Sequence, residues 1–138
     1  MRLGKDAKVE LIRGTPLFAQ CTRKELEALA AVADELPLPA GKTLTKQGET
    51  RREFMVLVEG TADVVRNGRR INQLGPGDFI GEIALLTGSP RTATVTATSD
   101  VLLLVLTARA FRRVVDRSPS VQDRIVAALA ARLAADAL

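Results

Sequence analysis

Residues 75–97 read GPGDFIGEIALLTGSPRTATVTA, and this stretch constrains the fold of the 138-residue chain. Glu82 opens a short apolar run, a glycine and a proline close it, and a β-branched run follows Arg91. The apolar run is long enough for about one helical turn, whose first amides, at Ile83 and Ala84, would lack intrahelical partners. Backbone amides exposed in this way form an anion-binding site.

Arg91 and Thr92 follow the apolar run and supply groups that bind a phosphate. An arginine offers a charge-assisted, bidentate fork to phosphate oxygens, and the neighbouring hydroxyl adds a donor. Glu82 would repel the same phosphate, so it suits another task, such as accepting a hydrogen bond from a sugar hydroxyl. Gly81 lets the backbone approach a ligand closely. A phosphate and a ribose in one small pocket indicate a nucleotide.

The sequence on either side consists of short apolar runs separated by glycine-containing turns, which is typical of strands. Asn67-Gly68, between two such runs, is the strongest short-range signal for a β-hairpin. Strands of this length at such regular spacing predict an antiparallel roll or barrel. The expected strands contain Leu44 and cover residues 54–58, 62–65, 71–74, 92–97 and 101–106.

Helical patterns flank the predicted roll. Thr22 and Glu25 form a capping box at the start of one helix, which Pro37 and Pro39 would end, and Ser118-Pro119 fits the start of the last helix. We therefore expect an α+β fold with an antiparallel, jelly-roll-like β-roll between N-terminal and C-terminal helices. The chain, 1–138, reads as one domain: helices at about 5–35, the roll at about 36–107 with the anion-binding segment at 81–93, and helices at about 108–136.

The composition excludes several classes of function. The chain has no histidine, which rules out Ser-His and Cys-His catalysis and an imidazole zinc site. It has no Trp or Tyr and four Phe, too few for a platform that stacks single-stranded nucleic acid. Cys21 is the single cysteine, which fits a reducing compartment, and no apolar run reaches the length of a membrane span. We expect a cytoplasmic, non-enzymatic protein without a metal or a cofactor.

The stretch at 81–93 resembles the phosphate-binding cassette of the cyclic nucleotide-binding domain family. That cassette reads Gly-Glu-apolar-small-Leu, then a short loop, then Pro-Arg-Ser/Thr-Ala. The matching residues here are Gly81, Glu82, Ile83, Ala84, Leu85, Pro90, Arg91, Thr92 and Ala93. Further motifs stand in the family's order, namely Pro16-Leu-Phe18, Pro39-Ala-Gly41, Gln47-Gly-Glu49, Phe54 to Gly60 and Leu74-Gly-Pro-Gly-Asp78.

The resemblance implies which residues hold the cyclic phosphate. Arg91 would pair with the exocyclic phosphate oxygens. The hydroxyl of Thr92 and the amides of Ala84 and Ala93 would add hydrogen bonds, with Ile83 in the same turn of exposed amides.

The resemblance also implies contacts to the ribose and the base. Glu82 would accept the ribose 2′-hydroxyl, with the backbone of Gly81 beside it. Val64 would line the base side. Arg132 matches a position from which the last helix caps the base in bacterial channel members of the family.

The family resemblance implies a regulatory module that binds cAMP or cGMP and shifts its last helix on binding. In the family, a threonine after the cassette arginine is associated with tolerance of cGMP or preference for it, because its hydroxyl can reach the amino group of a guanine in the syn conformation. Bacterial members with Ser or Thr there often bind cAMP, and we expect cAMP ahead of cGMP. The expected partners are the cyclic mononucleotide and an effector protein or domain outside this chain, with the chain itself a monomer or weak homodimer.

Three alternatives are open on the sequence alone. The first is a nucleotide-independent scaffold or dimerisation domain that retains the roll. The second is an enzyme on a jelly-roll barrel, which would need a metal that histidines normally hold. The third is nucleic-acid binding, which the arginine pairs at 51–52, 69–70 and 112–113 suggest, but two of these pairs fall at expected turns. We expect no DNA binding, because the chain ends at Leu138 without a helix-turn-helix after the last helix.

Overall fold

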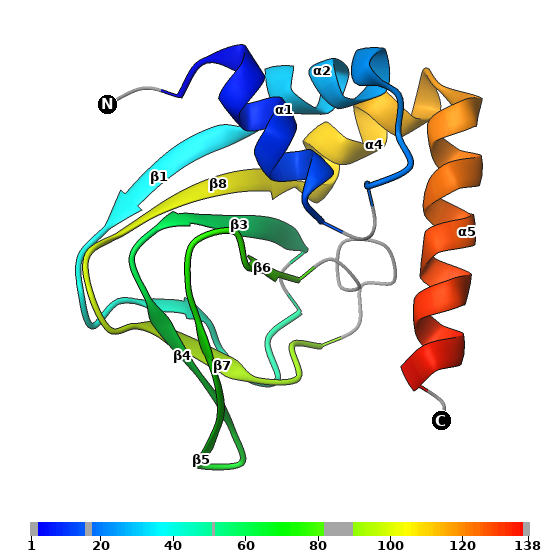
Figure 1. Cartoon of the computed structure of the whole chain (residues 1–138). Coiled ribbons are helices and arrows are strands. Elements are labelled where there is room, and N and C mark those ends of the chain that lie inside the picture. Colours follow the sequence, from blue (N-terminus) through cyan, green and yellow to red (C-terminus); the bar gives the residue numbers. More distant parts are fainter. Residues whose placement is uncertain (1–2, 16–17, 51, 82–89, 137–138) are drawn as a thin grey trace. The chain divides into compact units, whose positions relative to one another are not determined.

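The computed structural model describes residues 3–15, 18–50, 52–81 and 90–136, and in the last helix it describes the side chains up to Ala127 and that of Ala130. Residues 34–108 form one compact unit, which we call the roll unit. Residues 1–33 together with 109–138 form a second, the helical unit. Figure 1 shows the strands of the roll unit in cyan to yellow and the helices of the helical unit in blue, orange and red.

The roll unit contains two four-stranded sheets, one in the order β1-β8-β3-β6 and the other in the order β2-β7-β4-β5. All the described strand pairs are antiparallel. With the flanking helices, this arrangement confirms the predicted α+β fold with an antiparallel β-roll. The strands are β1 (Asp34–Leu38), β2 (Thr43–Thr45), β3 (Glu53–Glu59), β4 (Ala62–Arg66), β5 (Arg69–Leu74), β6 (Phe79–Ile80), β7 (Thr94–Ala97) and β8 (Val101–Thr107).

The core of the roll combines side chains from both sheets. Successive side chains of a strand point to opposite faces, so the members of one core recur at every second position. In β8 these members are Val101, Leu103 and Val105, and in β3 they are Met55 and Leu57. The remaining buried members are Leu44, Ala62, Val95 and Ala97.

The strand β1 corrects the prediction that the N-terminal helical region extends to residue 35. The preceding helix ends at Ala31, and Asp34–Leu38 pairs with β8 instead. Pro37 lacks an amide hydrogen, which a strand tolerates at the edge of a sheet. β1 is such an edge strand. Pro37 therefore lies inside a strand, opposite Leu102, rather than ending a helix.

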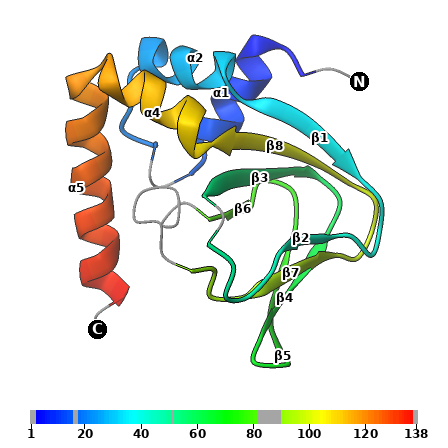
Figure 2. The same cartoon turned by 180° about the vertical axis from the view of Figure 1, so that it is seen from behind.

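The hairpin between β4 and β5 is confirmed at the predicted Asn67-Gly68 turn. Asn67 has a φ of 52° and Gly68 a φ of 76°, the pair of left-handed conformations that a type I′ turn requires. Arg66 and Arg69 face each other across the turn. Figure 2 shows this hairpin extending beyond the other strands of the roll unit.

The helical unit contains α1 (Lys5–Arg13), α2 (Arg23–Ala31), α4 (Ala108–Asp116, from Arg109 on) and α5 (Pro119–Asp136). The capping box at the start of α2 is confirmed: the hydroxyl of Thr22 accepts from the amide of Glu25 (3.2 Å), and the carboxylate of Glu25 accepts from the amide of Thr22 (2.7 Å). The rings of Phe18 and Phe111 meet edge to face, with centroids 6.1 Å apart. Elements from both ends of the sequence thus form one packed unit.

Glu25 also joins α2 to the start of α5. The hydroxyl of Ser120 donates to Oε2 of Glu25 (2.6 Å), and Nε of Arg124 lies 3.1 Å from Oε1. Burial raises the pKa of this carboxyl, but the hydrogen bonds from Ser120 and Thr22 and the charge of Arg124 outweigh burial, so the pKa lies below its ordinary value. A carboxyl with a lowered pKa stabilises the fold at neutral pH, and this contribution is lost as the pH falls through the folded-state pKa.

Replacing Glu25 with Gln should lower the free energy of unfolding at neutral pH, because a neutral amide cannot form the charge-assisted contacts to Ser120 and Arg124. As the pH falls through the range in which the wild-type carboxyl takes up a proton, the difference between the two proteins should shrink. Urea unfolding of both proteins across that range measures the effect. Glu59→Gln, at an exposed position in the roll unit, is the control. A Glu25→Gln difference that stays constant with pH would contradict the role given to Glu25.

Candidate functional site

The described part of the candidate site lies in the roll unit around Arg91. The described residues are Val64, Gly81, Arg91, Thr92 and Ala93. The predicted site residues Glu82, Ile83 and Ala84 lie outside the described residues. Arg132 lies in α5, and its side chain is also outside the described part.

The backbone of Arg91 is held by the turn at Gly48 and Glu49. The amide of Arg91 donates to the carbonyl of Glu49 (2.7 Å), and the carbonyl of Arg91 accepts from the amide of Gly48 (2.8 Å). Gly48 has a φ of 89°, a left-handed conformation that costs glycine little. Two backbone hydrogen bonds in opposite directions fix both the position and the direction of the chain at Arg91.

The guanidinium of Arg91 is buried against the backbone of Gly81. Arg91 is 6% exposed, and its Nη2 donates to the carbonyl of Glu53. A Cβ atom on Gly81 would lie 1.8 Å from Nη1 of Arg91 and 2.6 Å from the carbonyl oxygen of Glu53. Gly81 also has a φ of 82°. Position 81 therefore requires glycine for two reasons: its own backbone conformation and the close approach of the arginine side chain.

A largely buried guanidinium is suited to binding an anion. Removing a positive charge from water is costly unless nearby dipoles or an opposite charge compensate it. The planar fork of an arginine matches the paired oxygens of a phosphate or carboxylate. The geometry around Arg91 thus presents a positive charge in a fixed orientation at the boundary of the segment that the sequence assigns to anion binding.

Arg66, at the end of β4, contacts Thr92 through two groups and was not predicted from the sequence. Its Nε donates to the carbonyl of Thr92 (3.1 Å), and its Nη2 donates to the hydroxyl oxygen (3.4 Å). Because that oxygen accepts a hydrogen bond, the hydroxyl hydrogen of Thr92 can be donated to another acceptor. The signal in the sequence is weak, since only the register of β4 against β7, with Val65 opposite Thr94, brings Arg66 close to Thr92.

Further polar contacts fix the chain on either side of Arg91 and Thr92. The buried hydroxyl of Thr45 donates to the carbonyl of Ala93 (3.2 Å). The side chain of Gln47 both donates to the side chain of Asn67 (2.8 Å) and accepts from its amide (2.9 Å). The hairpin turn and the turn that clamps Arg91 are therefore tied together.

Val64 lies in β4 between Val95 of β7 and Asn72 of β5. It is half-buried and packs against the apolar core of the roll. Ile80, the residue before Gly81, packs against the same core. Val64 and the start of the candidate anion-binding segment therefore share one apolar interior.

Among the described residues, no three or more His, Cys, Asp or Glu side chains form a group that could hold a metal ion. None of the helices in the described ranges is both long enough and apolar enough to cross a membrane. Cys21 is buried in the helical unit, and burial, together with the charge of Glu25, raises the pKa of its thiol to about 11.

Comparison with known proteins places this geometry in a family. The family model described as the cyclic nucleotide-binding domain matches residues 35–118. The Pycsar effector protein XpPycTIR of Xanthomonas perforans is 37% identical over 114 residues, which are 81% of this chain and 38% of the relative. A cyclic nucleotide-gated potassium channel of Rhizobium etli is 33% identical over 116 residues, which are 84% of this chain and 32% of the channel. The chain spans about a third of the length of these curated relatives.

Solved structures agree with the family model. The N-terminal domain of a transcriptional regulator from Streptomyces coelicolor A3(2) matches with a TM-score of 0.83 and 32% identity, over 93% of this chain and 94% of that chain. The regulatory domain of Toxoplasma gondii PKA, solved as a co-crystal with cAMP, matches with a TM-score of 0.73 and 28% identity, over 80% of this chain and 44% of that chain. The family match covers more than half of the sequence and includes the segment around Arg91, and the chain belongs to the cyclic nucleotide-binding domain family.

Proposed function

We propose that this chain binds a cyclic mononucleotide, cAMP in preference to cGMP, as the sensor part of a regulatory protein. The observation that carries the proposal is the buried guanidinium of Arg91, fixed by the Gly48–Glu49 turn and by the close approach of Gly81. A phosphodiester is the anion that a single fixed guanidinium and an adjacent hydroxyl suit best, because it carries one charge and two free oxygens. The family and its cAMP-bound member support the same ligand.

The proposed contacts divide between phosphate, ribose and base. Arg91 binds the exocyclic phosphate oxygens, and the hydroxyl of Thr92 and the amides of Ala84 and Ala93 add donors. Glu82 and the backbone of Gly81 bind the ribose.

The base and the regulatory output involve other parts of the chain. Val64 lies on the base side, and Arg132 caps the base from α5. The output is a shift of the last helix between two conformations, in which the ligand favours the one that makes the most contacts with it. A coupling of about 1–3 kcal/mol between ligand and effector is typical of such modules.

Arg91→Ala should weaken cAMP binding by about thirtyfold or more, because truncation removes the buried positive charge that pairs with the phosphate. Isothermal titration of the chain with cAMP and with cGMP measures this, after unfolding and refolding have removed any nucleotide that co-purifies. Arg69→Ala, which removes an exposed arginine at the hairpin turn, should bind as the wild type does. Unchanged affinity in a folded Arg91→Ala protein would refute the site. A folded wild-type chain that binds neither nucleotide would favour the scaffold or dimerisation alternative.

Arg66→Ala should weaken cAMP binding by about three- to tenfold, the worth of one or two hydrogen bonds. Arg66 acts through Thr92 in this proposal, so the two substitutions should not be additive: in a Thr92→Ala background, Arg66→Ala should cost much less. The four proteins of this double-mutant cycle are titrated in the same way. Additive losses would mean that Arg66 contacts the ligand or the fold independently of Thr92.

Gly81→Ala should lower cAMP affinity by about tenfold or more, because the new methyl group overlaps the guanidinium of Arg91 and forces it to move. Gly77→Ala is the matched control. Gly77 also has a positive φ, of 92°, but a Cβ atom there would meet nothing within 4 Å. Equal affinities of the two variants would show that the position of the Arg91 guanidinium does not determine binding.

A further inference from the structure

The helical unit contains a groove of about 940 Å³, and among the described residues none of those proposed to bind nucleotide lines it. Its walls are α2 with Val32 after it, α4 with Arg117 and Ser118 after it, and the first turns of α5. All of these elements belong to one compact unit. We call this feature the basic groove, because Lys24, Arg113, Arg117 and Arg124 line it.

The positive charge of the basic groove is largely uncompensated. Glu25 is the one carboxylate among the described residues that line it, and Thr22, Ser120 and Arg124 already bind that carboxylate. Within the part of the chain that the structure describes, Lys24, Arg113 and Arg117 have no ion-pair partner. The exposed acids Asp116 and Asp123 lie on α4 and α5 but do not line the groove.

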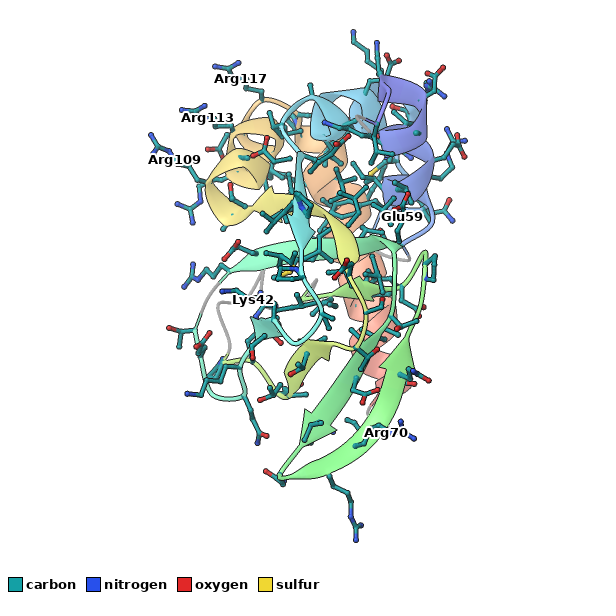
Figure 3. The ribbon with its side chains drawn as sticks, turned by 90° about the vertical axis from the view of Figure 1, so that its left-hand side faces the viewer. Lys42, Glu59, Arg70, Arg109, Arg113 and Arg117 are labelled. Carbon is teal, nitrogen blue, oxygen red and sulfur yellow. The ribbon has the colours of Figure 1, made fainter. Side chains whose placement is uncertain are left out.

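Arg109 and Arg113 of α4, with Arg117 directly after the helix, form a stripe that includes two residues of the groove. They follow each other at intervals of four residues, a spacing that places Arg109 and Arg113 on one face of α4. Figure 3 shows their three side chains pointing to the same side. Like charges at this spacing destabilise a helix, so the stripe lowers the stability of α4 unless an anionic partner is present.

The groove combines this charge with apolar surface. Val32 and Val114 are half-buried at its lining and expose apolar surface to it, whereas Val121 is fully buried. A nucleic acid would place its charged phosphate backbone against the exposed valines, which is unfavourable. A peptide can cover them with apolar side chains while its carboxylates bind the arginines. The size suits the side chains of a short segment, since ligand pockets run to about 1,000 Å³.

We propose that the basic groove docks an acidic, amphipathic peptide segment of a partner protein. Carboxylates of the segment pair with Lys24, Arg113 and Arg117, and its apolar side chains cover the exposed parts of Val32 and Val114. This inference goes beyond nucleotide binding and stands whether or not the chain binds a nucleotide, because it uses no residue of the proposed nucleotide site.

The test uses a fluorescent, helical peptide of about 18 residues with glutamates on one face and leucines on the adjacent face. Fluorescence anisotropy should show saturable binding to the full chain, and Arg113→Glu/Arg117→Glu should weaken it by about tenfold or more. Both side chains are exposed, so the variant should keep its fold, which circular dichroism checks. Arg69→Glu/Arg70→Glu carries the same change of charge on the hairpin of the roll unit and should bind as the wild type does.

Further probes separate the peptide from other occupants. A scrambled peptide of the same composition should bind about tenfold more weakly, because it cannot cover the valines. Val114→Gln should weaken binding of the amphipathic peptide about threefold or more. Equal binding of both peptides, binding of a short DNA duplex at least as tight, or no binding of the amphipathic peptide at about 1 mM would each overturn the proposal.

Discussion

The burial of Arg91 is the constraint on which the candidate site depends. A buried guanidinium is costly in a protein interior unless the surrounding atoms are arranged to receive it. Here three separate parts of the chain supply that arrangement: the Gly48–Glu49 turn holds its backbone, the carbonyl of Glu53 accepts from its fork, and Gly81 offers a surface without a side chain. The Gly48–Glu49 turn joins β2 to β3, Glu53 begins β3, Gly81 follows β6, and Arg91 precedes β7. The roll brings these parts together because β3 pairs with β6 and β2 pairs with β7.

The features of the structure that the sequence predicts are those that depend on short, contiguous motifs. The Thr22–Glu25 capping box and the Asn67-Gly68 turn each depend on residues within one turn of each other, so their geometry follows from local chemistry. Gly81 and Arg91 stand in one motif, and the need for glycine beside a buried arginine has a direct steric reason in the structure.

What the sequence does not predict depends on strand register and long-range pairing. Arg66 reaches Thr92 only because β4 pairs with β7 in one register, and a shift by one residue would turn its side chain to the other face. β1 forms because Asp34–Leu38 pairs with β8, which lies far along the chain, although the nearby prolines disfavour regular secondary structure. This long-range pairing outweighs the local propensity, since an edge strand tolerates a residue without an amide hydrogen.

The contact between Arg66 and Thr92 bears on the choice between cAMP and cGMP. Phosphate and ribose are common to both, so Arg91 and Glu82 cannot discriminate between them, and the choice falls to groups that meet the base. For Thr92 to favour cGMP, its hydroxyl oxygen has to accept from the guanine amino group. In this structure Nη2 of Arg66 donates to that oxygen (3.4 Å) and occupies one of its two lone pairs. The hydroxyl hydrogen can be donated to a phosphate oxygen of either nucleotide. Arg66 therefore competes only with the guanine amino group, and this competition supports the proposed order of cAMP ahead of cGMP.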